Sequence, residues 1–442
     1  MPSTVQLSIF NFSVVCLFIC TSCNNNRNNN SSQNDNIRQN IYGITQTLSE
    51  TENIKPFAFT GDKPISIEIP KNYTDPLFPS QLIESHRYIP LETNEHSLFG
   101  DIEKIIIRND KIFISDNFKS SVFIFNINGK FENKINSAGN GPYEYYRIDD
   151  FEIKGDNIII LDDIKNKLFT FTTEGKCMDE KDMAVSFDSF KFLTDESLFI
   201  YTGNSANEFI PALNNYEYLI GLPDSIITHI GFLRNEPRIR MAPNTNRPLT
   251  NYGDTVIFVP KYGQYAYEVT ENKMIKPRYI VDFKKPVTEA ALEGISLDDM
   301  GRSLDENGYE YISSPWLETD RYIFFYSNYK NKRNGISLRD FFYSKEYNKT
   351  TGYDGSVINY DTEYVFLGFS SPKTTHENMF VSVLPASDIL KRKKEIIKKN
   401  NNNPDNSIIL DIVNNLKEDD NPVLMLFDIK PFPDIKQFSD IK

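Results

Sequence analysis

The sequence is poor in the residues that build disulfide frameworks and metal cages. Only four of its 442 residues are cysteine, and Cys16, Cys20 and Cys23 all fall at the start of the chain. Cys177 is then alone in the rest of the chain, which excludes a disulfide scaffold there. Histidine is equally scarce, and no His-x-x-x-His or His-x-Glu spacing occurs, so the sequence predicts no metal site. The four histidines are His86, His96, His229 and His376.

Positive charge is in deficit. The chain carries 48 lysine and arginine residues against 61 aspartate and glutamate residues, a formal net charge of -13 at pH 7. Binding to a nucleic-acid backbone needs clustered Lys and Arg, so we expect no nucleic-acid partner. The sequence also lacks the Gly-x-Ser-x-Gly elbow, the phosphate-binding P-loop and the Rossmann fingerprint. It therefore predicts no catalytic residue of these classes and no cofactor.

The apolar run from Phe12 to Cys20 is too short to span a membrane and has the length of a signal-peptide core. It ends in Cys20-Thr21-Ser22-Cys23 and is followed by the polar tract NNNRNNNSSQNDN. This pattern resembles a bacterial lipoprotein signal, although Cys20 stands where an aliphatic residue is usual. The resemblance implies a signal peptide over residues 1–22 and a lipid on Cys23. An ordinary signal peptide and a mis-assigned start codon are the alternatives.

A lipid on Cys23 would place the protein at the bacterial cell envelope, in the periplasm or at the outer membrane, with membrane contact through the lipid. Residues 23–60 are rich in Asn and Ser at their start, which predicts a flexible polar tether. Hydrophobic residues make up 39% of the full chain, so we expect the remaining residues, 61–442, to bury a core.

One stretch of the sequence is repeated. Asp110 to Lys130 recurs 46 residues later as Asp156 to Lys176, with nine identical positions and no gap. Apolar residues alternate within each copy, which predicts a strand face, and Asn128-Gly129 supplies a hairpin turn. Two strands and a turn at this period are typical of a β-propeller blade. The matched residues of the first copy are Asp110, Ile112, Ile114, Asp116, Lys119, Phe123, Phe125, Gly129 and Lys130.

Weaker copies extend this pattern along the chain. A unit at Asp254 keeps the offsets of the unit at Asp156 after 98 residues, or two periods of 49. Counting the units predicts an all-β, six-bladed β-propeller over residues 61–442, with five or seven blades as the margin. A helical insertion is expected near residues 286–310 and a pair of helices near 387–417. One early strand should complete the last blade, since a closed propeller leaves no open sheet edge.

Several of these features occur together in a known family. The lipoprotein-like start, the RYIPLET segment, the repeated SDN or LDD and NGK or EGK motifs, the GNGPYEYYR loop and the NPVLMLFDIK ending are present. Together they resemble the six-bladed β-propeller lipoprotein-like proteins of gut Bacteroidetes. The resemblance implies the fold and the envelope location, and it implies no reaction. The family's loop usually reads Gly-x-Gly-Pro-Gly-Glu-Tyr, and here Tyr143 stands at the third glycine.

The repeated carboxylates Asp116 and Asp162, with Asp163, have two readings. Paired acids serve general acid/base chemistry or bind calcium. Asp at the end of a strand also accepts backbone N–H bonds in the turn that follows. Repetition favours the structural reading, because an active site needs each residue once.

The loop from Gly139 to Arg147 has the character of a binding site. Its glycines let the backbone bend, and its tyrosines offer apolar faces with polar tips. Glu144 and Arg147 carry groups that bond hydroxyls and carboxylates. The competing interpretation is that the loop packs a crossing between blades. The candidate ligand-binding residues are Tyr143, Glu144, Tyr145 and Arg147.

Three functions remain open at this point. The first is a non-catalytic envelope lipoprotein that binds or scaffolds a glycan, a peptide or an envelope protein. The second is a propeller enzyme, a lyase or hydrolase, that uses carboxylates facing the central channel. The third is an assembly factor that holds a partner through an exposed apolar patch on the insertion at 286–316.

Overall fold

The computed structural model describes residues 54–70, 79–203, 205, 207–222, 226–233, 248–292, 297–331, 335–354, 366–400 and 407–432. The chain divides into two units, Met1–Thr47 and Leu48–Lys442, and every described residue belongs to the second unit. Cys23, the expected signal peptide and most of the expected tether lie outside the described residues.

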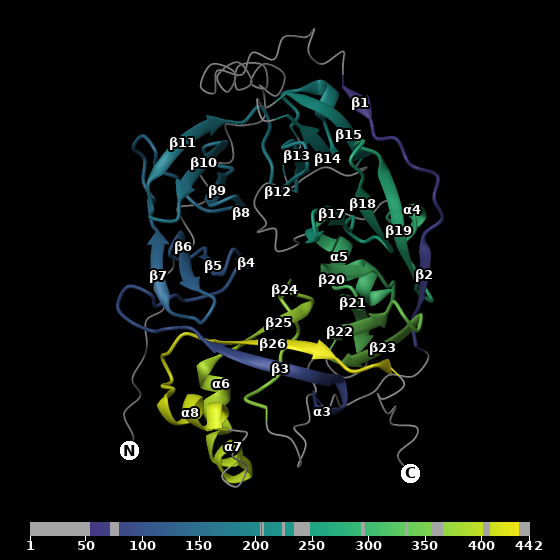
Figure 1. The fold of residues 1–442 in the computed structure, drawn as a ribbon. Helices are drawn as coiled ribbons and strands as arrows, with labels where there is room; N and C mark the ends of the chain where they lie inside the picture. Colours follow the sequence, from purple (N-terminus) through teal and green to yellow (C-terminus); the bar gives the residue numbers. More distant parts are fainter. Residues whose placement is uncertain are drawn as a thin grey trace, which may run out of the picture. The chain divides into compact units, whose positions relative to one another are not determined.

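Six sheets of mostly antiparallel strands are set around one axis, which confirms the six-bladed propeller (Figure 1). Each blade contributes four strands that run outward from the axis in chain order, except in the last blade. Blade 1 is β4 (Lys104–Arg108), β5 (Lys111–Asp116), β6 (Ser121–Asn126) and β7 (Phe131–Ile135). Blade 2 is β8 (Asp150–Lys154), β9 (Asn157–Asp162), β10 (Lys167–Thr172) and β11 (Cys177–Asp182). Blade 3 is β12 (Ser189–Phe192), β13 (Leu198–Tyr201), β14 (Tyr216–Gly221) and β15 (Ile227–Leu233).

The other three blades follow the same plan. Blade 4 is β16 (Leu249–Tyr252), β17 (Thr255–Phe258), β18 (Tyr265–Val269) and β19 (Ile275–Asp282). Blade 5 is β20 (Ile312–Glu318), β21 (Tyr322–Asn331), β22 (Gly335–Ser344) and β23 (Lys349–Asp354). Blade 6 is β24 (Thr374–His376), β25 (Met379–Leu384), β26 (Val423–Ile429) and the early strand β3 (Ile83–Pro90).

The ring is closed by β3, which pairs antiparallel with β26 from the end of the chain. Tyr88 lies opposite Met425 in this register. The sequence analysis expected an early strand to do this, and β3 contains the first part of the RYIPLET segment. This pairing covers the edge of β26 that would otherwise be open and makes β3 the outer strand of blade 6.

The residues before β3 form a strap across the outer edges of two blades, a feature that the sequence analysis did not foresee. β1 (Lys55–Pro56) pairs in parallel with β15 of blade 3, and β2 (Ile65–Glu68) pairs in parallel with β19 of blade 4. Phe57 is buried between them, and Ile67 is fully buried. Residues 54–60, at the end of the expected tether, are therefore in contact with the propeller.

The repeat explains the core between the blades. Ile114 lies opposite Phe123 in blade 1, and Ile160 lies opposite Phe169 in blade 2, and all four side chains are buried. The matched glycine of each copy closes the hairpin in the left-handed region that favours glycine; Gly129 has a φ of 82°. Alternating apolar positions thus fill the space between neighbouring sheets, as expected.

The helices lie where insertions were expected. α4 (Glu289–Leu292) and α5 (Leu297–Glu306) occupy the insertion between β19 and β20. α6 (Ala386–Lys391), α7 (Lys393–Asn400) and α8 (Ser407–Asn415) lie between β25 and β26, and the basic segment breaks at Arg392 into two helices. A short α3 (Pro79–Leu82) precedes β3. Within the described ranges, no helix combines the length and the apolar character that crossing a bilayer requires.

Candidate functional site

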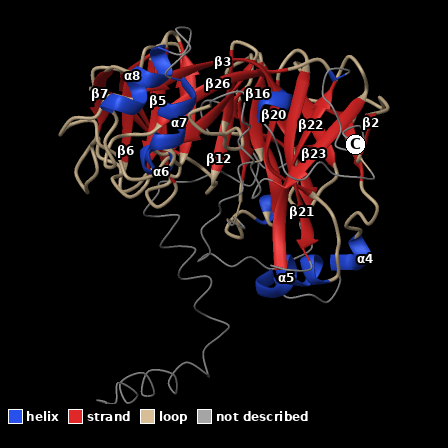
Figure 2. Ribbon diagram, turned by 90° about the horizontal axis from the view of Figure 1, so that it is seen from below, coloured by secondary structure: helices blue, strands red, loops and turns tan. Residues whose placement is uncertain are grey.

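The two faces of the propeller differ in the length of their connections. Antiparallel strands place alternate connections at opposite ends of a blade. One face, which we call the turn face, carries short turns such as 109–110, 155–156, 253–254 and 377–378. The other, which we call the loop face, carries the long connections 91–103, 136–149, 202–215, 283–311 and 385–422. In Figure 2, α5 and the end of β21 extend from the loop face. Long loops on a rigid scaffold are the usual carriers of function.

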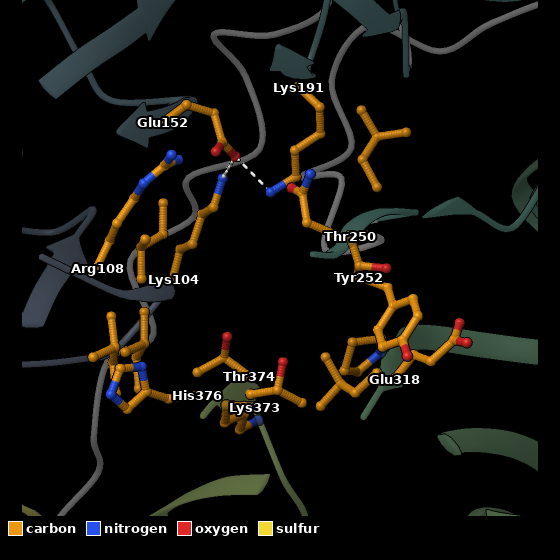
Figure 3. A pocket seen from close by; sticks show the side chains of 18 of the residues that line it. Lys104, Arg108, Glu152, Lys191, Thr250, Tyr252, Glu318, Lys373, Thr374 and His376 are labelled. Atoms are coloured by element: carbon orange, nitrogen blue, oxygen red, sulfur yellow. Dashed lines mark hydrogen bonds and ion pairs between the residues drawn. The ribbon is translucent and has the colours of Figure 1, made fainter. Parts of the chain in front are cut away.

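A central channel runs along the axis between the two faces. Its volume is about 1680 Å³, and the innermost strands of all six blades line it. Figure 3 shows the side chains on its wall, with Lys104, Glu152 and Lys191 on one side and Tyr252 and Glu318 on another. The wall therefore mixes apolar surface with charged groups from several blades.

Three blades meet in one group of charges on this wall. Lys104 of blade 1 donates from Nζ to Asp150 Oδ1 at 2.8 Å and to Glu152 Oε1 at 2.6 Å, both in blade 2. Lys191 of blade 3 forms an ion pair with the same Glu152 oxygen at 2.7 Å. Burial lowers the pKa of Lys191, and the nearby Glu152 carboxylate opposes this shift. This group joins three blades around the channel.

A second charged group lies between blades 4 and 5. Glu318 forms ion pairs with Arg278 and, at 2.7 Å, with Lys345 Nζ. Carboxylates that face the channel are one of the predicted catalytic sets. In the structure, Glu152 and Glu318 each form ion pairs with two cations. In the part of the chain that the structure describes, no group of three or more His, Cys, Asp or Glu could hold a metal ion.

On the loop face, the repeated Asp and Lys form the same latch in blades 1 and 2. Asp116 accepts the N–H of Lys119 at 3.1 Å and that of Gly100 at 2.7 Å. Lys119 Nζ donates to the carbonyl oxygen of Leu98 at 2.6 Å. These contacts tie the β5–β6 turn to the loop that enters blade 1.

The second latch repeats this geometry 46 residues later. Asp162 accepts the N–H groups of Lys165 and Tyr146, and Lys165 Nζ donates to the carbonyl oxygens of Glu144 and, at 2.9 Å, Gly139. The two aspartates thus cap turns, which supports the structural reading of the repeated acids. The loop that they hold in blade 2 is the candidate ligand-binding loop.

Within this loop, Tyr143 and Glu144 have different roles. Tyr143 is 55% exposed and has a φ of 62°, in the left-handed region that favours glycine. Its N–H donates to Glu180 Oε2 at 2.8 Å. The Glu144 carboxylate accepts the Gly141 N–H at 2.7 Å and fills the space beside Gly139, where an added Cβ would lie 2.0 Å from it. Glu144 therefore shapes the loop while Tyr143 projects from it.

Tyr145 is the one candidate residue that the loop turns inward. It is fully buried, packs edge-on against Phe169 and Phe171, and donates its hydroxyl to Ser120 O at 2.7 Å. Burial raises its pKa above the usual range of a tyrosine. Its ring therefore belongs to the core between blades 1 and 2. For this one residue of the loop, the interpretation that the loop packs a crossing between blades is correct. Tyr146, which the sequence analysis did not select, is 54% exposed.

Arg147 lies beside an acidic group at the border of blades 2 and 3. Its guanidinium forms an ion pair with Asp149 at 2.6 Å, and Asp149 accepts the Asp163 N–H at 2.8 Å. Burial, reinforced by Asp149 and Asp188, raises the pKa of Asp163 to about 7. Burial also raises the pKa of Asp149, against the pull of Arg147. The loop face thus carries two neighbouring carboxylates with raised pKa values, of which Asp163 titrates at about 7.

Five large apolar side chains in these loops are exposed. We call the group Leu98, Phe118, Tyr143, Tyr146 and Ile164 the apolar shelf; all lie in loop-face connections of blades 1 and 2. Phe118, 88% exposed, and Ile164 occupy equivalent places in the two latches. No large exposed apolar side chain occurs among the described side chains of the insertion at 286–316. Exposed apolar side chains therefore lie on the loop face of the first two blades.

Comparison with solved structures supports the fold. A protein of Bacteroides fragilis described as exported has a TM-score of 0.67 and 18% identity, over 84% of this chain and 100% of that one. A member of the DUF4221 family from Bacteroides vulgatus has a TM-score of 0.45 and 13% identity, over 79% and 98%. The virginiamycin B lyase of Staphylococcus aureus has a TM-score of 0.32 and 10% identity, over 61% and 88%. At these identities the likeness concerns the fold alone.

No curated protein matches the chain significantly. A family model described as a domain of unknown function, DUF4934, matches residues 64–428, which is most of the chain and all six blades. The chain therefore belongs to the DUF4934 family.

Proposed function

We propose that this protein is a non-catalytic binding protein of the bacterial cell envelope, held at a membrane by a lipid on Cys23, and that its ligand binds to the apolar shelf. The lipoprotein-like pattern before Cys23 and the likeness to an exported protein support the location. The strap pairs through β1 with the middle of β15, at His229 and Ile230.

The observation that carries the proposal is the backbone of Tyr143. A bulky residue in the left-handed region costs on the order of 1 kcal/mol, which glycine avoids. The structure around Tyr143 holds it there while half of its side chain stays exposed, so the ring gains little from packing. A strained, exposed aromatic residue on a rigid loop is typical of a binding surface.

The loop is also preorganised for binding. Lys165, Asp162 and Glu180 each hold its backbone through hydrogen bonds. The loop backbone is already fixed, so a ligand that stacks on Tyr143 and Tyr146 would restrict few additional rotatable bonds of the protein. This limits the entropic cost of association. Arg147 and Asp149 lie beside these rings as hydrogen-bonding groups. Stacking faces with adjacent polar groups suit a glycan or a peptide.

The test is a binding screen of the full chain against polysaccharides and peptides, followed by the variants Tyr143→Gly and Tyr146→Ala. The proposal expects each variant to weaken a detected ligand by about tenfold or more. Glu196→Gly is the matched control, because Glu196 also has a positive φ but lies in a turn-face hairpin. Unchanged affinity in both tyrosine variants would remove the shelf from the account.

A second candidate, a hydrolase or lyase, is favoured by one observation. Asp163 has a pKa of about 7 beside Asp149, and carboxylates with raised pKa values serve as general acids. If a shelf ligand is turned over, the rate should change near pH 7 and Asp163→Asn should abolish it. If the ligand is recovered unchanged after long incubation, the enzyme is rejected.

A further inference from the structure

The hydrogen bonds of Lys191 are incomplete. An ammonium group has three N–H donors, and that of Lys191 meets one acceptor among the described residues, Glu152 Oε1. Its side chain is only 10% exposed and lines the channel. Lys104, in the same group, is saturated by Asp150, Glu152 and the Phe151 carbonyl oxygen. Lys191 therefore keeps two donors for an oxygen that enters the channel.

Two other cations on the channel wall, unlike Lys191, have no carboxylate partner among the described residues. Arg108 donates to the carbonyl oxygen of Ile153 at 3.2 Å and forms no ion pair there. Lys373 is exposed beside Thr374, and its side chain makes no hydrogen bond or ion pair with a described residue. Figure 3 shows the three cations around the channel, with Lys191 at the top, Arg108 at the left and Lys373 at the bottom, across from Lys191.

Four carboxylates of the channel wall have partners among the described residues. Glu152 and Glu318 each hold two cations, and Glu196 forms an ion pair with Lys154 at 3.0 Å. Asp320 accepts hydrogen bonds from Tyr252 and Asn378. The spare N–H donors of the wall are those of Lys191, Arg108 and Lys373. The wall also carries the unpaired Oε2 of Glu318 and the exposed carboxylate of Asp254, so a bound anion must lie against the cations and away from these two groups.

We propose that the channel is a second binding site, separate from the apolar shelf, for a ligand that carries a carboxylate or phosphate oxyanion. The oxyanion accepts hydrogen bonds from the two spare N–H groups of Lys191. Arg108 and Lys373 add positive potential along the wall. The volume of about 1680 Å³ leaves room for the rest of a ligand of drug size or larger.

The test is calorimetric titration of the full chain with three probes: inorganic phosphate, citrate and galacturonate. The proposal expects saturable binding of at least one probe that weakens as salt is added. A preference for phosphate or for the two carboxylates identifies the oxyanion. Lys191→Met should weaken that probe by about tenfold or more, because charge-assisted hydrogen bonds are lost.

Lys130→Met is the matched control, since Lys130 is an exposed lysine of a turn-face hairpin. Should Lys191→Met fail to fold, the double variant Arg108→Met/Lys373→Met tests the same potential, with an expected weakening of severalfold. No saturable binding of any probe to the wild-type chain would overturn the proposal. So would equal affinity in the folded Lys191→Met chain, or in the double variant, which would leave Lys191 as a link between blades 2 and 3 only.

Discussion

Tyr143 has a backbone conformation that glycine adopts without strain. Replacing it with glycine should therefore weaken ligand binding with little effect on the stability of the fold. Tyr143→Gly removes about 1 kcal/mol of backbone strain from the folded state. It also raises the conformational entropy of the unfolded chain, which lowers stability by a similar amount. The Glu180 hydrogen bond remains, since it uses the backbone N–H. We expect the thermal midpoint to move by no more than about 2 °C, measured by calorimetry. A loss of many degrees would show that the ring packs as core.

Asp163 makes stability depend on pH in a direction opposite to that of an ion-paired acid. Its pKa is raised from 3.8 to about 7, so the folded state holds a proton that the unfolded state has released. Stability from this group is present at low pH and is lost as pH rises from about 4 to 7. Asp163→Asn, which mimics the protonated acid, should raise the thermal midpoint at pH 8 and leave it nearly unchanged at pH 4.

The control for this pH series is Asp179→Asn, at an exposed position of β11. It should alter the midpoint by a small amount that does not grow between pH 4 and 8. If Asp163→Asn destabilises the protein equally at both pH values, the carboxylate is needed for its hydrogen bonds and not merely tolerated as an acid.

The latch of blade 2 explains how a loop of 14 residues is kept rigid. Lys165→Met removes the hydrogen bonds to Gly139 and Glu144, and bonds to charged groups contribute about 1.5–3 kcal/mol. We expect faster amide hydrogen exchange at 138–146 while the fold is retained. Lys119→Met is the matched control: it should loosen the residues near Leu98 and leave 138–146 unchanged. The reverse pattern would contradict the latch.

The strap depends on a close contact between Phe57 and Gly231. An added Cβ on Gly231 would lie 2.1 Å from the Phe57 ring, so Gly231→Ala should displace the ring and cost about 1–3 kcal/mol. In a chain that already carries Phe57→Ala, the same change should cost much less. Denaturant midpoints of the two single variants and the double variant measure this coupling. Additive effects would show that the ring is not seated against Gly231.

The sequence predicted the elements whose signals are local. Alternating apolar residues and glycine turns place β5, β6, β9 and β10 correctly, because each copy carries its own hairpin. The strap escaped prediction because parallel pairing with β15 and β19 joins segments more than 170 residues apart and leaves no periodic signal. The loop from Gly139 to Arg147 was predicted as a binding site, but its sequence did not show that Tyr145 is buried and Tyr146 exposed.

The group of charged residues on the channel wall could not be predicted from local sequence patterns either. Lys104, Glu152 and Lys191 lie on the inner strands of three blades, and only closure of the ring brings them together. Their shared position near the start of each unit was the available signal. At the scale of the molecule, the propeller thus gathers residues that the sequence separates, and it gathers long connections on one face.

The central claim is that the loop face of blades 1 and 2 binds a ligand without changing it. The most direct test is amide hydrogen exchange of the full chain with and without a ligand found in the screen. The mass of the ligand recovered from the same sample is then measured by mass spectrometry. The account predicts slower exchange at 138–147 and near Phe118, no change at the turn-face hairpins, and a ligand of unchanged mass. Protection confined to another part of the propeller, or a ligand that is cleaved, would contradict it.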